Sequence, residues 1–147
     1  MKIYIDTCGW SRPYDEKTQQ KVIDEGAAVL KIVKQARRRG FTILGSLTLE
    51  DEISEIDDAE VHVWVANLYK ASVTAEADYN DGIFTSLRSQ AEDAGVGGWD
   101  AYHLCYAESS KADYLFTVDK KFLKNASKLN TNVKVMNPLT FVQGGLI

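Results

Sequence analysis

Two kinds of hydrophobic pattern alternate along the chain. Short runs of apolar and β-branched residues are typical of strands covered on both faces, and longer segments with apolar residues every three or four positions are typical of amphipathic helices. The short runs predict strands at residues 2–5, 41–44, 72–74, 114–118 and 133–135. The longer segments predict helices at residues 17–39, 47–56, 76–94 and 120–128, after the acidic pair 57–58, from residue 100 and from residue 138.

Strands that alternate with helices imply a parallel sheet with right-handed crossovers. The chain has no internal repeat, low-complexity tract or linker, so the pattern predicts a single α/β domain over residues 1–147. Residues 7–15, which contain the first of two prolines, are expected to run irregularly across the carboxyl edge of the first strand.

Composition narrows the class of protein. A net charge of −4 argues against a broadly basic surface that coats nucleic acid. The two cysteines, Cys8 and Cys105, form neither a metal-ligand pair nor a disulfide framework, as expected in a reducing compartment. No apolar stretch approaches the ~20 residues that span a bilayer, and an acid comes too early in the chain for a signal peptide. We expect a cytoplasmic protein without membrane association.

Four acids occupy positions that a parallel sheet would bring together if their strands were adjacent. Asp6 ends the first strand and Asp119 ends the strand at 114–118, and ligands of α/β sheets bind beyond the carboxyl ends of such strands. Asp100 opens a helix, and Glu52 lies at the border of the apolar stripe of its helix. Three of them also have a structural explanation: a helix cap for Asp119, a first-turn charge for Asp100 and a solvated face for Glu52. A cap explains Asp6 less well, because an irregular loop is expected after it.

Clustered carboxylates repel one another, so a group of three or four requires protonation or a cation. Hard oxygen ligands without an accompanying set of Cys and His favour Mg²⁺ or Mn²⁺ over zinc. Mg²⁺ held by carboxylates keeps several waters and acts through phosphate oxygens. A cluster of these acids therefore predicts phosphodiester or other phosphoryl chemistry.

The order of these motifs resembles the PIN-domain nucleases, including the VapC-like toxins of toxin–antitoxin pairs, over nearly the whole chain. The matching segments are MKIYIDTCGWSRPYD, GSLTLEDEIS and GWDAYHLCYAESSKADYLFTVDKKF. Asp6 matches the family's acid at the end of the first strand, and Glu52 matches its acid on the helix after the second strand. Asp100 opens the family's D-A-x-H-x-x-x-A pattern, and Asp119 closes a T-x-D pattern that begins at Thr117.

The resemblance implies a three-layer fold whose five-stranded parallel sheet has the order 3-2-1-4-5. It implies that Asp6, Glu52 and Asp100 bind Mg²⁺ or Mn²⁺, with Asp119 a ligand directly or through water, and that these four acids are the catalytic residues. The implied activity is metal-dependent hydrolysis of RNA by a toxin, with a protein antitoxin and a second copy of the chain as partners.

Residues that flank the acids are candidates for substrate binding. They are Thr7, Arg12, Thr117, Lys120 and Lys121. Arg12 either contacts phosphate or holds its loop to a neighbouring carboxylate, and relatives more often carry Asn in place of the preceding Ser11. Lys120 and Lys121 either bring positive charge to RNA or form a solvated helix face.

Two further interpretations use the same residues. One is a PIN-like domain that binds RNA or a protein partner without cutting, against which the four intact acids argue. The other is a metal-dependent phosphatase of another α/β fold, although no D-x-D motif follows the first strand. His103, one turn after Asp100, is expected to be packed and hydrogen-bonded rather than to act as a base.

Overall fold

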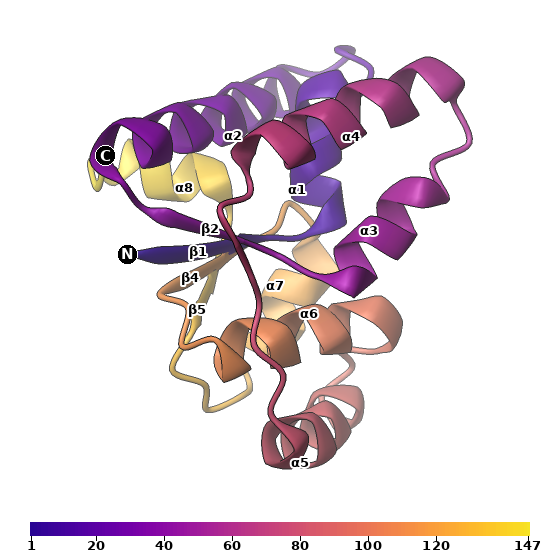
Figure 1. Cartoon of the computed structure of the whole chain (residues 1–147), viewed down its shortest axis with the longest axis vertical. Helices are drawn as coiled ribbons and strands as arrows, with labels where there is room; N and C mark the ends of the chain where they lie inside the picture. Colours follow the sequence, from indigo (N-terminus) through magenta and orange to yellow (C-terminus); the bar gives the residue numbers. More distant parts are fainter.

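One all-parallel sheet of five strands forms the centre of the molecule, in the order β3-β2-β1-β4-β5 (Figure 1). The structure is a computed structural model that describes residues 1–147. The strands are β1 (Lys2–Ile5), β2 (Thr42–Gly45), β3 (Ala75–Glu76), β4 (Tyr114–Phe116) and β5 (Lys134–Met136). The predicted α/β class and the strand order 3-2-1-4-5 are confirmed, and the ends of β1 and β4 lie side by side.

Helices cover both faces of this sheet and complete a three-layer arrangement. They are α1 (Thr7–Ser11), the 3-10 helix η1 (Arg12–Tyr14), α2 (Gln20–Arg39), α3 (Leu47–Ser54), α4 (Ala59–Ser72), α5 (Asp81–Asp93), α6 (Gly98–Ser109), α7 (Lys120–Ala126) and α8 (Pro138–Gln143). Figure 1 shows α1, α2, α4 and α8 above the sheet, α5, α6 and α7 below it, and α3 beyond the carboxyl ends of the strands. None of the helices combines the length and apolar character that a transmembrane span requires.

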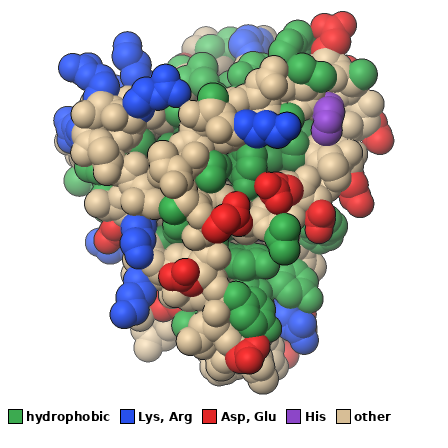
Figure 2. Space-filling model, in the orientation of Figure 1, with side chains coloured by type: hydrophobic (Ala, Val, Ile, Leu, Met, Phe, Trp, Pro, Cys, Tyr) green, Lys and Arg blue, Asp and Glu red, His purple; other side chains and the backbone are tan.

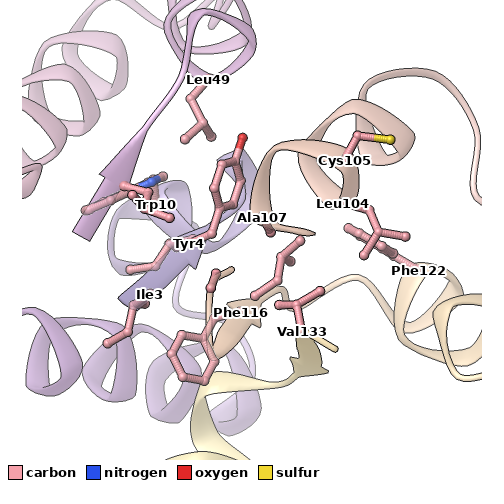
Figure 3. Packing of buried hydrophobic residues seen from close by; sticks show 14 of the residues in the cluster. Ile3, Tyr4, Trp10, Leu49, Leu104, Cys105, Ala107, Phe116, Phe122 and Val133 are labelled. Atoms are coloured by element: carbon pink, nitrogen blue, oxygen red, sulfur yellow. The ribbon is translucent and has the colours of Figure 1, made fainter. Parts of the chain in front are cut away.

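The first strand lies in the middle of the core. Ile3, Tyr4 and Ile5 expose almost no surface, because helices pack on both faces of β1. Figure 3 shows Tyr4 directed toward Leu49 on one side, while Phe116 of the neighbouring strand lies on the other. Burial of a large apolar side chain contributes about 1.5–3 kcal/mol, so this two-sided cover explains why β1 has an uninterrupted apolar run.

Residues 7–14 are helical, and the expectation of an irregular loop over residues 7–15 was wrong. The side chain of Asp6 accepts a hydrogen bond from the Gly9 N–H at 2.9 Å and caps α1. Trp10 on that helix is fully buried and meets Tyr69 edge-on, with ring centroids 5.6 Å apart. The short helix exists because Trp10 is anchored in the core, which a five-residue pattern does not reveal.

The predicted third strand at residues 72–74 was also wrong. Ser72 ends α4, where its hydroxyl donates to the Leu68 carbonyl at 2.6 Å. The strand is instead Ala75–Glu76, and both of its residues are exposed. Its pairing with β2 continues in the backbone bond from Ala77 N–H to the Gly45 carbonyl at 2.7 Å. An exposed edge strand of two residues carries no apolar pattern to detect.

Two predicted helices differ from the structure in their details. The helix expected at 76–94 begins at Asp81, because the Asn80 side chain caps it by accepting from the Ile83 N–H at 3.0 Å. The long α2 leaves its apolar residues Ile23 and Leu30 exposed and buries a carboxylate, Glu25. The predicted amphipathic helix is confirmed, but its buried face excludes Ile23 and Leu30 and includes Glu25.

Candidate active site

Asp6 is buried where the β1 and β4 ends meet. Its own N–H donates to the Phe116 carbonyl of β4 at 3.1 Å, and its Oδ1 caps α1. The Cys8 thiol donates to the same carboxylate, at 3.1 and 3.2 Å from its two oxygens. Burial raises the pKa of Asp6, while His103 and the hydrogen bonds act in the opposite direction. Asp6 therefore both caps α1 and lies at the carboxyl ends of β1 and β4.

Asp100 lies in the first turn of α6, shortly after Gly98, whose φ of +57° suits glycine. Its pKa is raised to about 6, first by burial and then by the charge of Asp6. The charges of Asp119 and Glu52 act in the same direction, whereas His103 lowers the pKa. The charges that raise this pKa belong to the other three predicted acids, so all four lie in one region.

Asp119 caps α7, so the interpretation of this residue as a helix cap is confirmed. Its Oδ1 accepts from the backbone N–H groups of Lys121 at 2.9 Å and Phe122 at 3.1 Å. The Thr117 hydroxyl accepts from the backbone N–H of Asp119 at 3.1 Å. The residue is exposed, so it contributes charge to the cluster from the solvent side.

Glu52 points from α3 toward α6, where its Oε1 is hydrogen-bonded to the His103 Nε2. The Thr7 hydroxyl donates to the same oxygen at 2.8 Å. His103 is 1% exposed, and its Nδ1 lies 2.6 Å from the Tyr4 hydroxyl. The expectation that His103 is packed and hydrogen-bonded is confirmed.

A buried network behind Glu52 is the part of the site that sequence reasoning missed. The Tyr4 hydroxyl bonds both His103 and the Ser46 hydroxyl, the latter at 2.8 Å. Burial raises the pKa of Tyr4 well above its ordinary value, so the phenol stays protonated. The only sequence signal was the spacing of His103 one helical turn after Asp100.

The donor set suits a hard divalent cation. Four carboxylates supply oxygen ligands. Burial raises the pKa of Asp6 and of Asp100, and neighbouring carboxylates add to the effect at Asp100, so a proton or a cation would stabilise this group. No set of three or more His, Cys, Asp and Glu side chains is arranged to hold a metal ion in the geometry of this structure. The chemistry of the residues therefore fits Mg²⁺ or Mn²⁺, while Asp6 and Glu52 are hydrogen-bonded within the protein.

The residues predicted to bind substrate fall into three environments. Thr7 and Thr117 lie among the acids, with Thr117 fully buried and 3.3 Å from the Cys8 sulfur. Arg12 faces away toward carboxylates, with Nη1 3.0 Å from Asp15 and Nε 3.3 Å from Glu25.

Lys120 and Lys121 are exposed at the start of α7, next to the acids. Cys8 is also at the site, but burial and the charge of Asp6 raise the pKa of its thiol. The thiol is therefore a hydrogen-bond donor to Asp6 and not a nucleophile.

Comparison with known proteins places the fold. No family model matches the sequence, and no curated protein matches it. Among solved structures, a chain of VapBC2 from Rickettsia felis, bound to a DNA fragment from their promoter, superposes with a TM-score of 0.61 at 16% identity. The match covers 92% of this chain and 99% of that chain.

A second solved structure gives a similar result. A chain of FitAcB from Neisseria gonorrhoeae superposes with a TM-score of 0.56 at 16% identity, over 92% of this chain and 97% of that chain. At such low identity the agreement concerns the backbone. The chain has the PIN-like α/β fold.

Proposed function

We propose that this PIN-like chain is a metal-dependent endoribonuclease that hydrolyses RNA phosphodiester bonds, as the toxin component of a toxin–antitoxin pair. The observation that carries the proposal is geometric: Asp6 and Asp119 follow the adjacent parallel strands β1 and β4, and the charges of Asp6, Asp119 and Glu52 all act on Asp100. Four carboxylates at the carboxyl edge of a parallel sheet are a donor set suited to a hard divalent cation such as Mg²⁺ or Mn²⁺.

Each acid has a role in this proposal. Asp6, Glu52 and Asp100 hold the cation, and Asp119 serves it directly or through water. The bound cation would polarise the scissile phosphate and lower the pKa of a water. A carboxylate of the cluster orients the attacking water or accepts its proton. Lys120 and Lys121, exposed beside Asp119, bring positive charge to the phosphate backbone.

The proposed partners follow from the same interpretation. The similarity to a chain of VapBC2 and the motif order of VapC-like toxins support a protein antitoxin as partner. A second copy of the chain is a further proposed partner, and α4 offers an exposed apolar surface at Val63 and Trp64. We also propose that the chain acts on RNA in the cytoplasm.

One observation favours a second candidate, a PIN-like domain that binds RNA or a protein partner without cutting. Glu52 is occupied by His103 and Thr7, and the acids are not arranged to hold a metal as they stand. In that case the carboxylates would be structural, and neither Mg²⁺ nor Mn²⁺ would stabilise the fold.

Substitution of the acids tests the proposal directly. Asp6→Asn, Glu52→Gln and Asp100→Asn are each expected to retain the fold and to abolish Mg²⁺- or Mn²⁺-dependent cleavage of RNA. Asp51→Asn is the matched control, because Asp51 is an exposed acid beside Glu52 on the same helix. Undiminished cleavage by folded Asp6→Asn protein would overturn the proposal.

Metal-linked stability separates the two candidates. A cation that binds only the folded chain raises its Tm, by an amount equivalent to about 2.7 kcal/mol at 100 times its Kd. Mn²⁺ is expected to raise the Tm of the wild type and of Asp51→Asn, but not that of Asp6→Asn. An unchanged Tm in the wild type would favour the domain that does not cut.

A further inference from the structure

A hollow of about 370 Å³ lies between α5, α6 and the start of α3, apart from the four acids. Its volume is within the range of small-molecule sites, about 300–1,000 Å³. Its lining is mainly aromatic and includes Thr48, Tyr79, Phe84, Arg88, Tyr102 and Tyr106. Figure 2 shows hydrophobic side chains gathered over α6 and between it and α5, in the lower half of that face.

Packing of α5 on α6 accounts for only part of this aromatic group. Phe84 is 7% exposed and meets Tyr106 edge-on, with ring centroids 4.9 Å apart. Tyr79, in contrast, is 61% exposed although its ring lies 4.4 Å from that of Phe84. Tyr102 is 38% exposed. Two tyrosine rings thus rest on a buried phenylalanine and present open surface to solvent.

One cation belongs to the same hollow. The Arg88 guanidinium lies 5.8 Å from the Tyr102 ring centroid, and its Nη1 donates to the Tyr102 hydroxyl at 3.2 Å. Its other ionic contact, with Glu92, is long at 3.8 Å and exposed. Most of the five N–H donors of Arg88 are therefore available to an anionic ligand.

The hollow adjoins the acids through two helices. Thr48 and Glu52 are four residues apart on α3, so they lie on one face of that helix, about 6 Å apart along its axis. On α6, Tyr106 lines the hollow and follows His103 by three residues, so the two side chains lie on the same face of that helix. A ligand that extends from Glu52 along α3 and α6 toward Thr48 and Tyr106 would reach the aromatic rings.

We infer that this hollow binds a base of single-stranded RNA next to the scissile phosphate, with Arg88 on the phosphate of that nucleotide. The inference rests on the proposed function and adds a binding site to it. Aromatic side chains stack on any base, and an arginine beside them supplies local positive charge in a chain whose net charge is −4. Thr48 and the tyrosine hydroxyls offer hydrogen bonds to the edge of the base.

The test uses the full-length chain made inactive by Asp6→Asn and a fluorescein-labelled pool of random single-stranded RNA, with binding followed by anisotropy. Tyr79→Leu added to this chain removes the exposed ring and keeps an apolar side chain. It is expected to raise the Kd roughly 5- to 100-fold. Leu30→Ala is the control, because Leu30 is an exposed apolar residue on α2, away from the hollow, and the Kd of this variant for RNA is expected to stay unchanged.

Two further measurements test the contact with the base and the contact with the phosphate separately. On an abasic ribose-phosphate strand of the same length, Tyr79→Leu is expected to have no effect, because no base is there to stack. Arg88→Gln is expected to weaken binding and to reduce the salt dependence of log Kd by about 0.7 for one lost phosphate contact. An equal loss with Leu30→Ala, or an equal effect of Tyr79→Leu on the abasic strand, overturns the inference.

Cleavage by the wild type, measured separately, distinguishes failure of the inference from failure of the proposed function. If the wild type cuts RNA and Tyr79→Leu leaves both Kd and KM unchanged, the inference fails and the proposed function stands. If the inactive chain binds RNA through Tyr79 but the wild type does not cut, the inference stands and the proposed activity fails. Absence of both binding and cleavage overturns both.

Discussion

His103 on α6 holds Glu52 on α3 through a hydrogen bond between Nε2 and the carboxylate Oε1. A carboxylate accepts, so Nε2 carries the proton, and in the neutral ring Nδ1 accepts from the Tyr4 hydroxyl at 2.6 Å. The pair ties the helix after β2 to the helix before β4. It also fixes the orientation of the only glutamate among the four acids.

Removal of this donor is expected to weaken metal binding. Hydrogen-bond partners of metal ligands typically contribute 10- to 100-fold to metal affinity or activity, so His103→Phe is expected to raise the Mn²⁺ Kd by that order. Tyr4→Phe removes only the bond behind the ring, and a smaller effect is expected. Mn²⁺ titration followed by Tm measures both. His62→Gln is the control histidine, and an unchanged Mn²⁺ Kd in folded His103→Phe would contradict the positioning role.

The raised pKa of Asp100 predicts a pH-dependent penalty on the metal-free fold. The folded carboxyl, with a pKa of about 6, binds more protons than the unfolded one, so this contribution to stability falls as pH rises from about 4 to about 6 and then levels off. The penalty is at most about 3 kcal/mol, and solvent screening of this partly exposed group reduces it to roughly 1–2 kcal/mol.

Asp100→Asn is therefore expected to stabilise the metal-free chain above pH 6 and to make little difference below pH 4. Urea unfolding of both proteins across this range, with a chelator present, measures the difference. A difference that does not depend on pH would show that Asp100 is not strained by burial and by its neighbouring charges. Saturating Mn²⁺ is expected to remove or reverse the advantage of the variant.

Gly45 at the end of β2 allows the close approach of α4. A Cβ there would lie 2.5 Å from the Tyr69 hydroxyl and 2.9 Å from a methyl group of Val73. Gly45→Ala is expected to destabilise the fold by about 1–3 kcal/mol, because overpacking forces these side chains to move. Gly97→Ala is the control, since a Cβ on Gly97 would meet no atom within 4 Å and this residue caps α6 without a side-chain bond. Equal unfolding midpoints for the two variants would refute the prediction.

Arg12 neutralises the buried carboxylate of Glu25, which is 1% exposed, across 3.3 Å. Arg12→Met is expected to destabilise the chain by about 3 kcal/mol, because it leaves a buried charge with only the Asn137 amide as partner. The double variant Arg12→Met, Glu25→Gln is expected to regain most of that loss in urea unfolding. If the rescued double variant also shows a raised KM for RNA, Arg12 contacts substrate in addition to its structural pairing.

The sequence by itself determined the order and type of most elements. Their signals are local: an apolar period within one segment, Asp58 before α4, and Gly40 after α2 with a φ of +71°. The alternation of these elements implied a parallel sheet, and the resemblance supplied its strand order. The four acids were found for the same reason, because each lies at the end or border of an element that the pattern identifies.

Tertiary structure decided the features that depend on distant contacts. The helix α1 forms because Trp10 is anchored against Tyr69, and β3 exists because two exposed residues pair with β2. Glu25 can be buried because the Arg12 guanidinium neutralises its charge. The network behind Glu52 joins residues 42, 51 and 99 positions apart in the chain. No local pattern encodes such pairs, since their hydrogen bonds exist only once the sheet has brought the elements together.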